Sequence, residues 1–93
     1  MTTDVRDAPD RNRYEVTVDG ELAGFAEYRD QDGARVFTHT EVFDAFEGKG
    51  VGTVLARGAL AAVRAAGTPV VAKCPFIAGY IERHDEYQDL LRD

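Results

Sequence analysis

The run Glu47-Gly48-Lys49-Gly50-Val51-Gly52 places three glycines within five residues, at the junction between a predicted strand and a predicted helix. Glycine allows the backbone to turn sharply, and the free N–H groups of a helix N-terminus attract anions with help from the helix dipole. The run, extended to Thr53, therefore predicts an anion-binding loop. The alternative for a motif of this kind is a glycine-rich connector that holds no ligand.

Two common phosphate-binding motifs do not fit these glycines. A Walker A loop needs Ser or Thr after its lysine, but Lys49 is followed by Gly50. A dinucleotide fingerprint that starts at Gly48 would need glycine in place of Thr53. The same fingerprint started at Gly50 would need glycine in place of Leu55. Neither motif is present, so the glycines alone do not identify the anion.

Three further side chains could do acid–base or nucleophilic chemistry. His39 and Glu41 stand in the polar middle of a predicted strand and share one face if that strand is regular. His39 fits a base for an attacking amine as well as a partly exposed strand residue, whereas Glu41 is more typical of a solvated charge. Cys74 precedes a helix-starting proline, where free N–H groups can stabilise a thiolate that accepts an acyl group. It fits slightly better as a small apolar residue that ends a buried strand.

The elements that must position these side chains follow from the apolar pattern. Alternation at Tyr14, Val16 and Val18, followed by Asp19-Gly20, predicts a strand and a tight hairpin. Gly24 predicts a bulge or a close approach in the next strand. The other predicted elements are strands at about 22–28 and 35–43, a helix from 51 to 67, a short strand at 70–73 and a helical segment from Pro75.

Composition limits the class of protein. The 93 residues fit one compact domain, and residues 1–12 lack periodicity, so we expect a flexible segment there and the domain at 13–93. A net charge of −6 argues against nucleic-acid binding, and no apolar run is long enough to span a membrane. The single cysteine excludes a Cys-rich zinc cluster, and no metal site is expected. These features predict a cytoplasmic protein.

Three segments together carry a family resemblance: His39-Thr40-Glu41-Val42, the glycine loop, and Cys74-Pro75-Phe76 with the tail from Tyr80 to Tyr87. In this order they resemble the small, minimal branch of the GNAT superfamily of N-acetyltransferases, over roughly Tyr14 to Leu91. The resemblance implies an α+β, three-layer-like core: an antiparallel three-stranded meander, a helix, a short parallel strand and a C-terminal helix. It also implies that the strands ending at Phe43 and Lys73 splay apart.

The resemblance further implies an acetyl-CoA site and a reaction. The pantetheine arm would lie in the gap between those strands, with the pyrophosphate on the loop, and Tyr80 would protonate the departing CoA thiolate. His39, Glu41 and Cys74 complete the candidate catalytic set. The residues expected to contact acetyl-CoA are Val42, Phe43, Gly48, Lys49, Gly50, Val51, Gly52 and Thr53.

The chain departs from the family pattern at two places. Glu47 stands where the family loop usually begins with Gln or Arg, and Asp19-Gly20 closes a hairpin where larger relatives have two helices over the acceptor. We therefore expect an open acceptor side. The acceptor would be an amine, whether a protein lysine, a polyamine or a small amine, and the protein a monomer or weak dimer. The alternative function is a CoA-binding or protein-interaction module without turnover.

Overall fold

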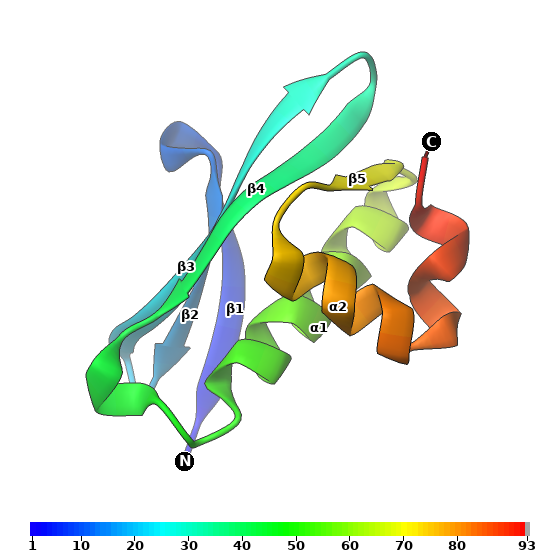
Figure 1. Ribbon diagram of the computed structural model, residues 1–93. Coiled ribbons are helices and arrows are strands. Elements are labelled where there is room, and N and C mark those ends of the chain that lie inside the picture. Colours follow the sequence, from blue (N-terminus) through cyan, green and yellow to red (C-terminus); the bar gives the residue numbers. More distant parts are fainter. Residues whose placement is uncertain (93) are drawn as a thin grey trace.

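The computed structural model describes residues 1–92 and contains one five-stranded sheet with its helices (Figure 1). The sheet order is β1-β2-β3-β4-β5, with four antiparallel strands and a parallel β5. The strands are β1 Thr3–Ala8, β2 Arg13–Val18, β3 Glu21–Gln31, β4 Ala34–Val42 and β5 Val70–Ala72. The helices are α1 Val51–Ala66 and α2 Pro75–Arg83, with the 3-10 turns η1 Pro9–Arg11, η2 Asp44–Phe46 and η3 Asp85–Leu90.

Both α-helices lie on the same face of the sheet: α1 packs across the four antiparallel strands, and α2 packs against β4, β5 and α1 (Figure 1). The alternating residues Tyr14, Val16 and Val18 turn inward, as their spacing predicts, and meet Leu55 and Ile77 in one core. The opposite face carries no helix within the described residues, and its side chains are partly or fully exposed along most of β2 and β3. None of the described helices is both long and apolar enough to cross a membrane.

The N-terminal segment is a strand, so the expectation of a flexible lead-in was wrong for Thr3–Ala8. This segment pairs with β2 along its whole length. Val5 packs against Gly58 of α1, and the Tyr28 hydroxyl donates a 2.6 Å hydrogen bond to Asp7. An edge strand needs backbone pairing on one side only, so it can form without an alternating apolar pattern. In this strand Val5 alone packs against the core.

The hairpin turn at Asp19-Gly20 and the close approach at Gly24 were predicted correctly. Asp19 and Gly20 adopt φ values of 50° and 85°, the conformation of a two-residue hairpin turn. Gly24 is a close-approach point, because a side chain there would collide with the carbonyl oxygen of Glu41 on β4.

Strand β4 is paired with β5 over only part of its length. The parallel register joins Arg35–Phe37 to Val70–Ala72 and stops there. The β3 register shifts at this point and leaves Thr38 as an extra residue on β4. The N–H groups of Lys73 and Cys74 both donate to the Phe37 carbonyl, each at 3.0 Å. Beyond Phe37 the two strands separate, so the second half of β4 has a free edge.

Candidate functional site

The free edge of β4 carries the backbone groups of Thr40 and Val42. In an antiparallel pair, successive residues direct their N–H and C=O groups to opposite sides. Phe43 donates to Ala23 on β3 at 2.9 Å, so Glu41 and His39 also point toward β3. Thr40 and Val42 must then direct their N–H and C=O groups into the gap. An extended molecule containing amides can pair with this edge as a further strand would.

The backbone N–H of Phe43 is not free at this edge. Its N–H is bonded to Ala23, and its carbonyl oxygen accepts a 2.8 Å bond from the N–H of Phe46 at the start of the loop. Thr40 takes its place on the free edge and was missed. The period of two, counted back from Val42, would have identified it.

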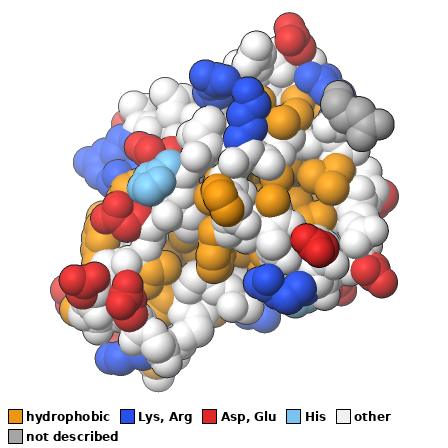
Figure 2. Space-filling view, in the orientation of Figure 1, with side chains coloured by type: hydrophobic (Ala, Val, Ile, Leu, Met, Phe, Trp, Pro, Cys, Tyr) orange, Lys and Arg blue, Asp and Glu red, His pale blue; other side chains and the backbone are white. Residues whose placement is uncertain are grey.

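A groove of about 240 Å³ continues from this edge to the beginning of α1. Hydrophobic side chains gather between the sheet and the helices on the face drawn in Figure 2. The groove is lined by Val42, Phe46, Glu47, Gly48, Gly50, Val51, Gly52, Thr53 and Phe76. Apart from Lys49, which lies in the loop but not in this lining, it contains all of the expected loop residues.

The loop presents free backbone donors to the groove. Gly48 and Gly50 have φ values of 78° and 75°, which favour glycine, and α1 starts directly after Gly50. The Gly50 carbonyl accepts the first helical bond, from Val54, at 3.2 Å. No side chain caps this end of the helix. The N–H groups of residues 51–53 therefore have no helical partner, as an anion-binding helix N-terminus requires.

Lys49 is the one basic side chain in the loop, and it is exposed. Glu47 is exposed too, and it forms no ion pair within residues 1–92. The two charges offset each other, so attraction for an anion depends on the backbone donors.

Phe76 forms a wall of the groove and was not predicted as a site residue. It is one of the few large apolar residues left exposed, at 38%. A Cβ atom on Gly52 would lie 2.9 Å from the Phe76 ring and 3.5 Å from Val42. Glycine at position 52 thus lets the ring rest on the first turn of α1. A large apolar residue at the exposed start of α2 was the signal for this role.

Cys74 lies at the point where β4 and β5 separate. Its thiol donates to the Thr40 hydroxyl oxygen at 3.2 Å, and the residue is 3% exposed. Cys74 is also part of the hydrophobic core. The structure thus brings Cys74 to the inner end of the free edge, next to Thr40, with its sulfur largely shielded from water.

His39 and Glu41 meet on the open face of the sheet. The Nε2 atom of His39 lies 3.4 Å from a carboxylate oxygen of Glu41, and both side chains are about half exposed, at 56% and 50%. The shared face agrees with regular alternation, because the irregularity at Thr38 comes before this pair. The His39 ring also lies 6.1 Å from that of Phe25.

Tyr80 lies among residues of α1 and the C-terminal segment. Its ring stacks on His84 at 3.9 Å, with Tyr87 at 5.8 Å. Burial raises the pKa of Tyr80, and the negative charges of Tyr87 and Glu86 act in the same direction, whereas Arg57 opposes them. Its hydroxyl makes no hydrogen bond with another part of the described chain. The raised pKa keeps the Tyr80 hydroxyl protonated at neutral pH. Cys74, with its bond to Thr40 of β4, lies at the N-terminal end of the same helix, α2.

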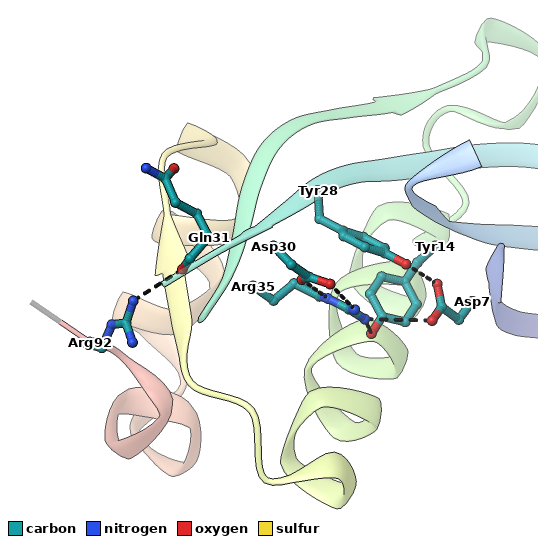
Figure 3. A network of polar contacts seen from close by, with 7 residues as sticks. All are labelled: Asp7, Tyr14, Tyr28, Asp30, Gln31, Arg35 and Arg92. Atoms are coloured by element: carbon teal, nitrogen blue, oxygen red, sulfur yellow. Dashed lines mark hydrogen bonds and ion pairs between the residues drawn. The ribbon is translucent and has the colours of Figure 1, made fainter. Parts of the chain in front are cut away.

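A polar network holds the base of β4 (Figure 3). Arg35 donates to Asp30 at 2.8 and 2.9 Å and to the Tyr14 hydroxyl at 2.8 Å. Its guanidinium lies 3.9 Å from the Tyr28 ring centroid, and Tyr28 in turn donates to Asp7. The bonds from Arg35 lower the pKa of Asp30, and burial followed by the Asp7 bond raises the pKa of Tyr28. The network ties β1, β2 and β3 to β4 beyond the bulge, at the end opposite to the free edge.

Comparisons with known proteins agree on one family. The sequence profile described as GCN5-related N-acetyl-transferase matches residues 13–90. The solution structure of a GCN5-like protein from Staphylococcus aureus is similar to this fold, with a TM-score of 0.71 at 23% identity, over 96% of this chain and 87% of that one. A search of curated protein sequences gave no match.

Proposed function

Because this chain belongs to the GCN5-related N-acetyltransferase family and is an acetyltransferase, we propose that it takes acetyl from acetyl-CoA in the β4 groove and transfers it to an amine. The observation that carries the proposal is the continuity of two features: the free edge at Thr40 and Val42 leads directly to the unpaired N–H groups at the start of α1. A ligand with amides in an extended arm, followed by phosphates, would match this order: the amides with the free strand edge, and the phosphates with the N–H groups.

The proposal assigns each part of the donor to residues of the groove. The amides of the pantetheine arm would pair with the N–H and C=O groups of Thr40 and Val42, and Phe76 would cover the arm. The pyrophosphate would accept from the N–H groups of Val51, Gly52 and Thr53. The acetyl thioester supplies the activated carbonyl carbon and would lie near the separation point of β4 and β5.

Side chains of the protein would accept and donate the protons of the reaction. An aliphatic ammonium must lose one proton before it can attack, and His39, oriented by Glu41, would accept it. The C–N bond then forms and the C–S bond breaks; the departing sulfur takes one proton from an acid, and the second proton lost by nitrogen would return to that acid through water. Tyr80, whose hydroxyl stays protonated, is proposed as the acid that delivers a proton to this sulfur.

The buried thiol favours direct transfer over an acetyl-enzyme. Cys74 is 3% exposed and donates to Thr40, so a nucleophilic attack would first require loss of that proton in an apolar setting. Its size and shielding suit the hydrophobic end of β5, next to the core.

Calorimetry with acetyl-CoA and a transfer assay test the proposal together. We expect binding and amine-dependent release of CoA by the parent protein, and Tyr80→Phe should lower turnover while leaving the dissociation constant of acetyl-CoA unchanged. Tyr87→Phe, on the neighbouring ring, is the control. Equal turnover in the two variants would remove Tyr80 from the mechanism. Binding without turnover on any amine would instead support a CoA-binding module.

A further inference from the structure

Thr40 places a hydroxyl group on the inner face of β4, where the neighbouring side chains are apolar. Its partner across the β3–β4 register is Ala26, which is fully buried, and cross-strand partners point to the same face of a sheet. Phe37, the last β4 residue paired with β5, belongs to the same core. Valine has nearly the same shape as threonine, lacks the hydroxyl and is favoured in strands. The hydroxyl, and not the shape, is thus the feature that a ligand could use.

The Thr40 hydroxyl has a hydrogen left to donate. A threonine hydroxyl carries one donor hydrogen and two acceptor lone pairs. One lone pair accepts from the Cys74 thiol at 3.2 Å, and the Thr40 side chain makes no other hydrogen bond with residues 1–92. By contrast, the Thr38 hydroxyl, two residues earlier on the same strand, donates to the Glu27 carbonyl at 3.4 Å. The Thr40 hydrogen is therefore available to a ligand, whereas that of Thr38 is bonded within the sheet.

The accessible side of the Thr40 hydroxyl is the gap between β4 and β5. The Cys74 thiol covers the hydroxyl from the side of the core, and Cys74 is only 3% exposed. Thr40 itself is partly exposed. No residue of β5 pairs with it, because the parallel register stops at Phe37. The free hydrogen can thus be directed into the gap, where the proposed function places the acetyl thioester.

The thioester has two acceptor atoms, and they differ in strength. Thioether-like sulfur accepts hydrogen bonds weakly, whereas a carbonyl oxygen accepts well, and bonds to a charged oxygen are stronger still. When the amine nitrogen bonds to the carbonyl carbon, the π electrons of the C=O group move to oxygen, and they return when the C–S bond breaks. A donor at this oxygen therefore stabilises the transition state more than it stabilises the bound thioester.

We propose that the Thr40 hydroxyl is a catalytic group that donates a hydrogen bond to the acetyl carbonyl oxygen of the bound donor. Thr40 keeps its proton throughout, so this role adds no proton transfer to those assigned to His39 and Tyr80. The inference rests on the proposed function and adds a residue that the expected catalytic set did not contain.

Three variants separate the hydroxyl from the shape of the side chain. Thr40→Val removes the hydroxyl, so its turnover number should fall at least about tenfold, while its dissociation constant for acetyl-CoA changes by less than about twofold. Thr40→Ser restores the hydroxyl and should recover turnover to within about threefold of the parent. Thr38→Val is the control and should keep the parent's turnover, because the Thr38 hydroxyl is bonded within the sheet. Parent-like turnover in Thr40→Val, or an equal loss in Thr40→Ser, would overturn the assignment.

The ¹³C resonance of the bound acetyl group tests the contact without turnover. The probe is acetyl-CoA labelled with ¹³C at the acetyl carbonyl. A hydrogen bond polarises the carbonyl group and moves this resonance downfield. We expect a downfield shift on binding to the parent and to Thr40→Ser, and a smaller shift with Thr40→Val. Equal shifts in the three proteins would overturn the proposal even if Thr40→Val were slow, because the hydroxyl would then not act at the carbonyl oxygen.

Failure of this proposal and failure of the proposed function give different results. If the parent binds acetyl-CoA and releases CoA only with an amine, parent-like turnover in Thr40→Val removes Thr40 alone. If the parent does not bind acetyl-CoA, the proposed function fails and the assignment of Thr40 fails with it. If the parent binds without turnover, the carbonyl resonances of the three proteins decide whether Thr40 contacts the acetyl group.

Discussion

The sulfur of Cys74 lies 3.2 Å from the hydroxyl oxygen of Thr40, across the point where β4 and β5 separate. This contact links the two strands directly after their last backbone bonds, at the Phe37 carbonyl. It lies at the inner end of the gap, where the proposed function places the thioester of the donor. The covalent and direct mechanisms differ at this contact.

Replacing Cys74 tests the route of transfer. Because the sulfur is buried and bonded to Thr40, we expect Cys74→Ala to retain most of the activity, with a stability loss of about 1 kcal/mol from the lost packing. Intact mass spectrometry of the parent protein after incubation with acetyl-CoA alone should show no added acetyl group. A kinetically competent thioester mapped to Cys74 would establish the acetyl-enzyme route instead.

Gly50 and Gly67 form a matched pair at the two ends of α1, with φ values of 75° and 69°. A valine at either position is strained, so both variants should lose stability. Only Gly50→Val also blocks the approach of phosphates to the helix N-terminus. We expect its dissociation constant for CoA, measured by calorimetry on folded protein, to rise at least about tenfold. Comparable losses in Gly67→Val would mean that strain, and not the loop, controls binding.

The contact between Gly52 and Phe76 predicts a non-additive pair. Gly52→Ala puts a Cβ atom 2.9 Å from the Phe76 ring and should lower stability despite alanine's higher helix propensity. In the Phe76→Ala background the same change should be neutral or stabilising, by up to about 1 kcal/mol. Urea unfolding of the four proteins measures this coupling. Equal effects of Gly52→Ala in both backgrounds would show that the ring does not rest on this turn.

The Tyr28 hydroxyl predicts a loss of stability at alkaline pH. Its pKa is raised in the folded state, mainly by burial and by the bond to Asp7, so folding favours the protonated form. The stabilisation is complete below the unfolded pKa of about 10 and is lost as the pH rises above it. The free energy of unfolding, measured from pH 8 to 11, should therefore fall less steeply with pH for Tyr28→Phe than for the parent. Tyr14 and Tyr80, whose pKa values are also raised, should contribute to the remaining slope.

Residue patterns correctly predicted the elements that bury an apolar face. They failed for elements that are held mainly by backbone hydrogen bonds. The alternation from Tyr14 to Val18 and the helical spacing after Val51 placed β2 and α1 correctly. Strand β1 was not predicted, because an edge strand can form with a single residue, Val5, packed at the margin of the core. The irregularity at Thr38 and the free edge were not predicted either. Both depend on pairing between strands that are distant in sequence, which the residue pattern of β4 does not indicate.

The same distinction holds for the candidate site. The glycine loop and the shared face of His39 and Glu41 follow from local spacing, and the structure has both. The backbone groups of Phe43 are bonded to Ala23 and Phe46, and these partners are set by tertiary structure, which local spacing does not predict. The contact between Phe76 and Gly52 joins two helices, so the apolar residue at the start of α2 was a signal for a site residue but did not identify its partner.

The placement of the donor is tested most directly by amide hydrogen exchange at Thr40 and Val42, with and without CoA. Both N–H groups face the gap, whereas those of His39 and Glu41 are directed to β3 and serve as internal controls. Our account predicts that CoA slows exchange at Thr40 and Val42 by at least about tenfold and leaves the two controls nearly unchanged. Unchanged exchange at Thr40 and Val42 in the CoA-bound protein would contradict it.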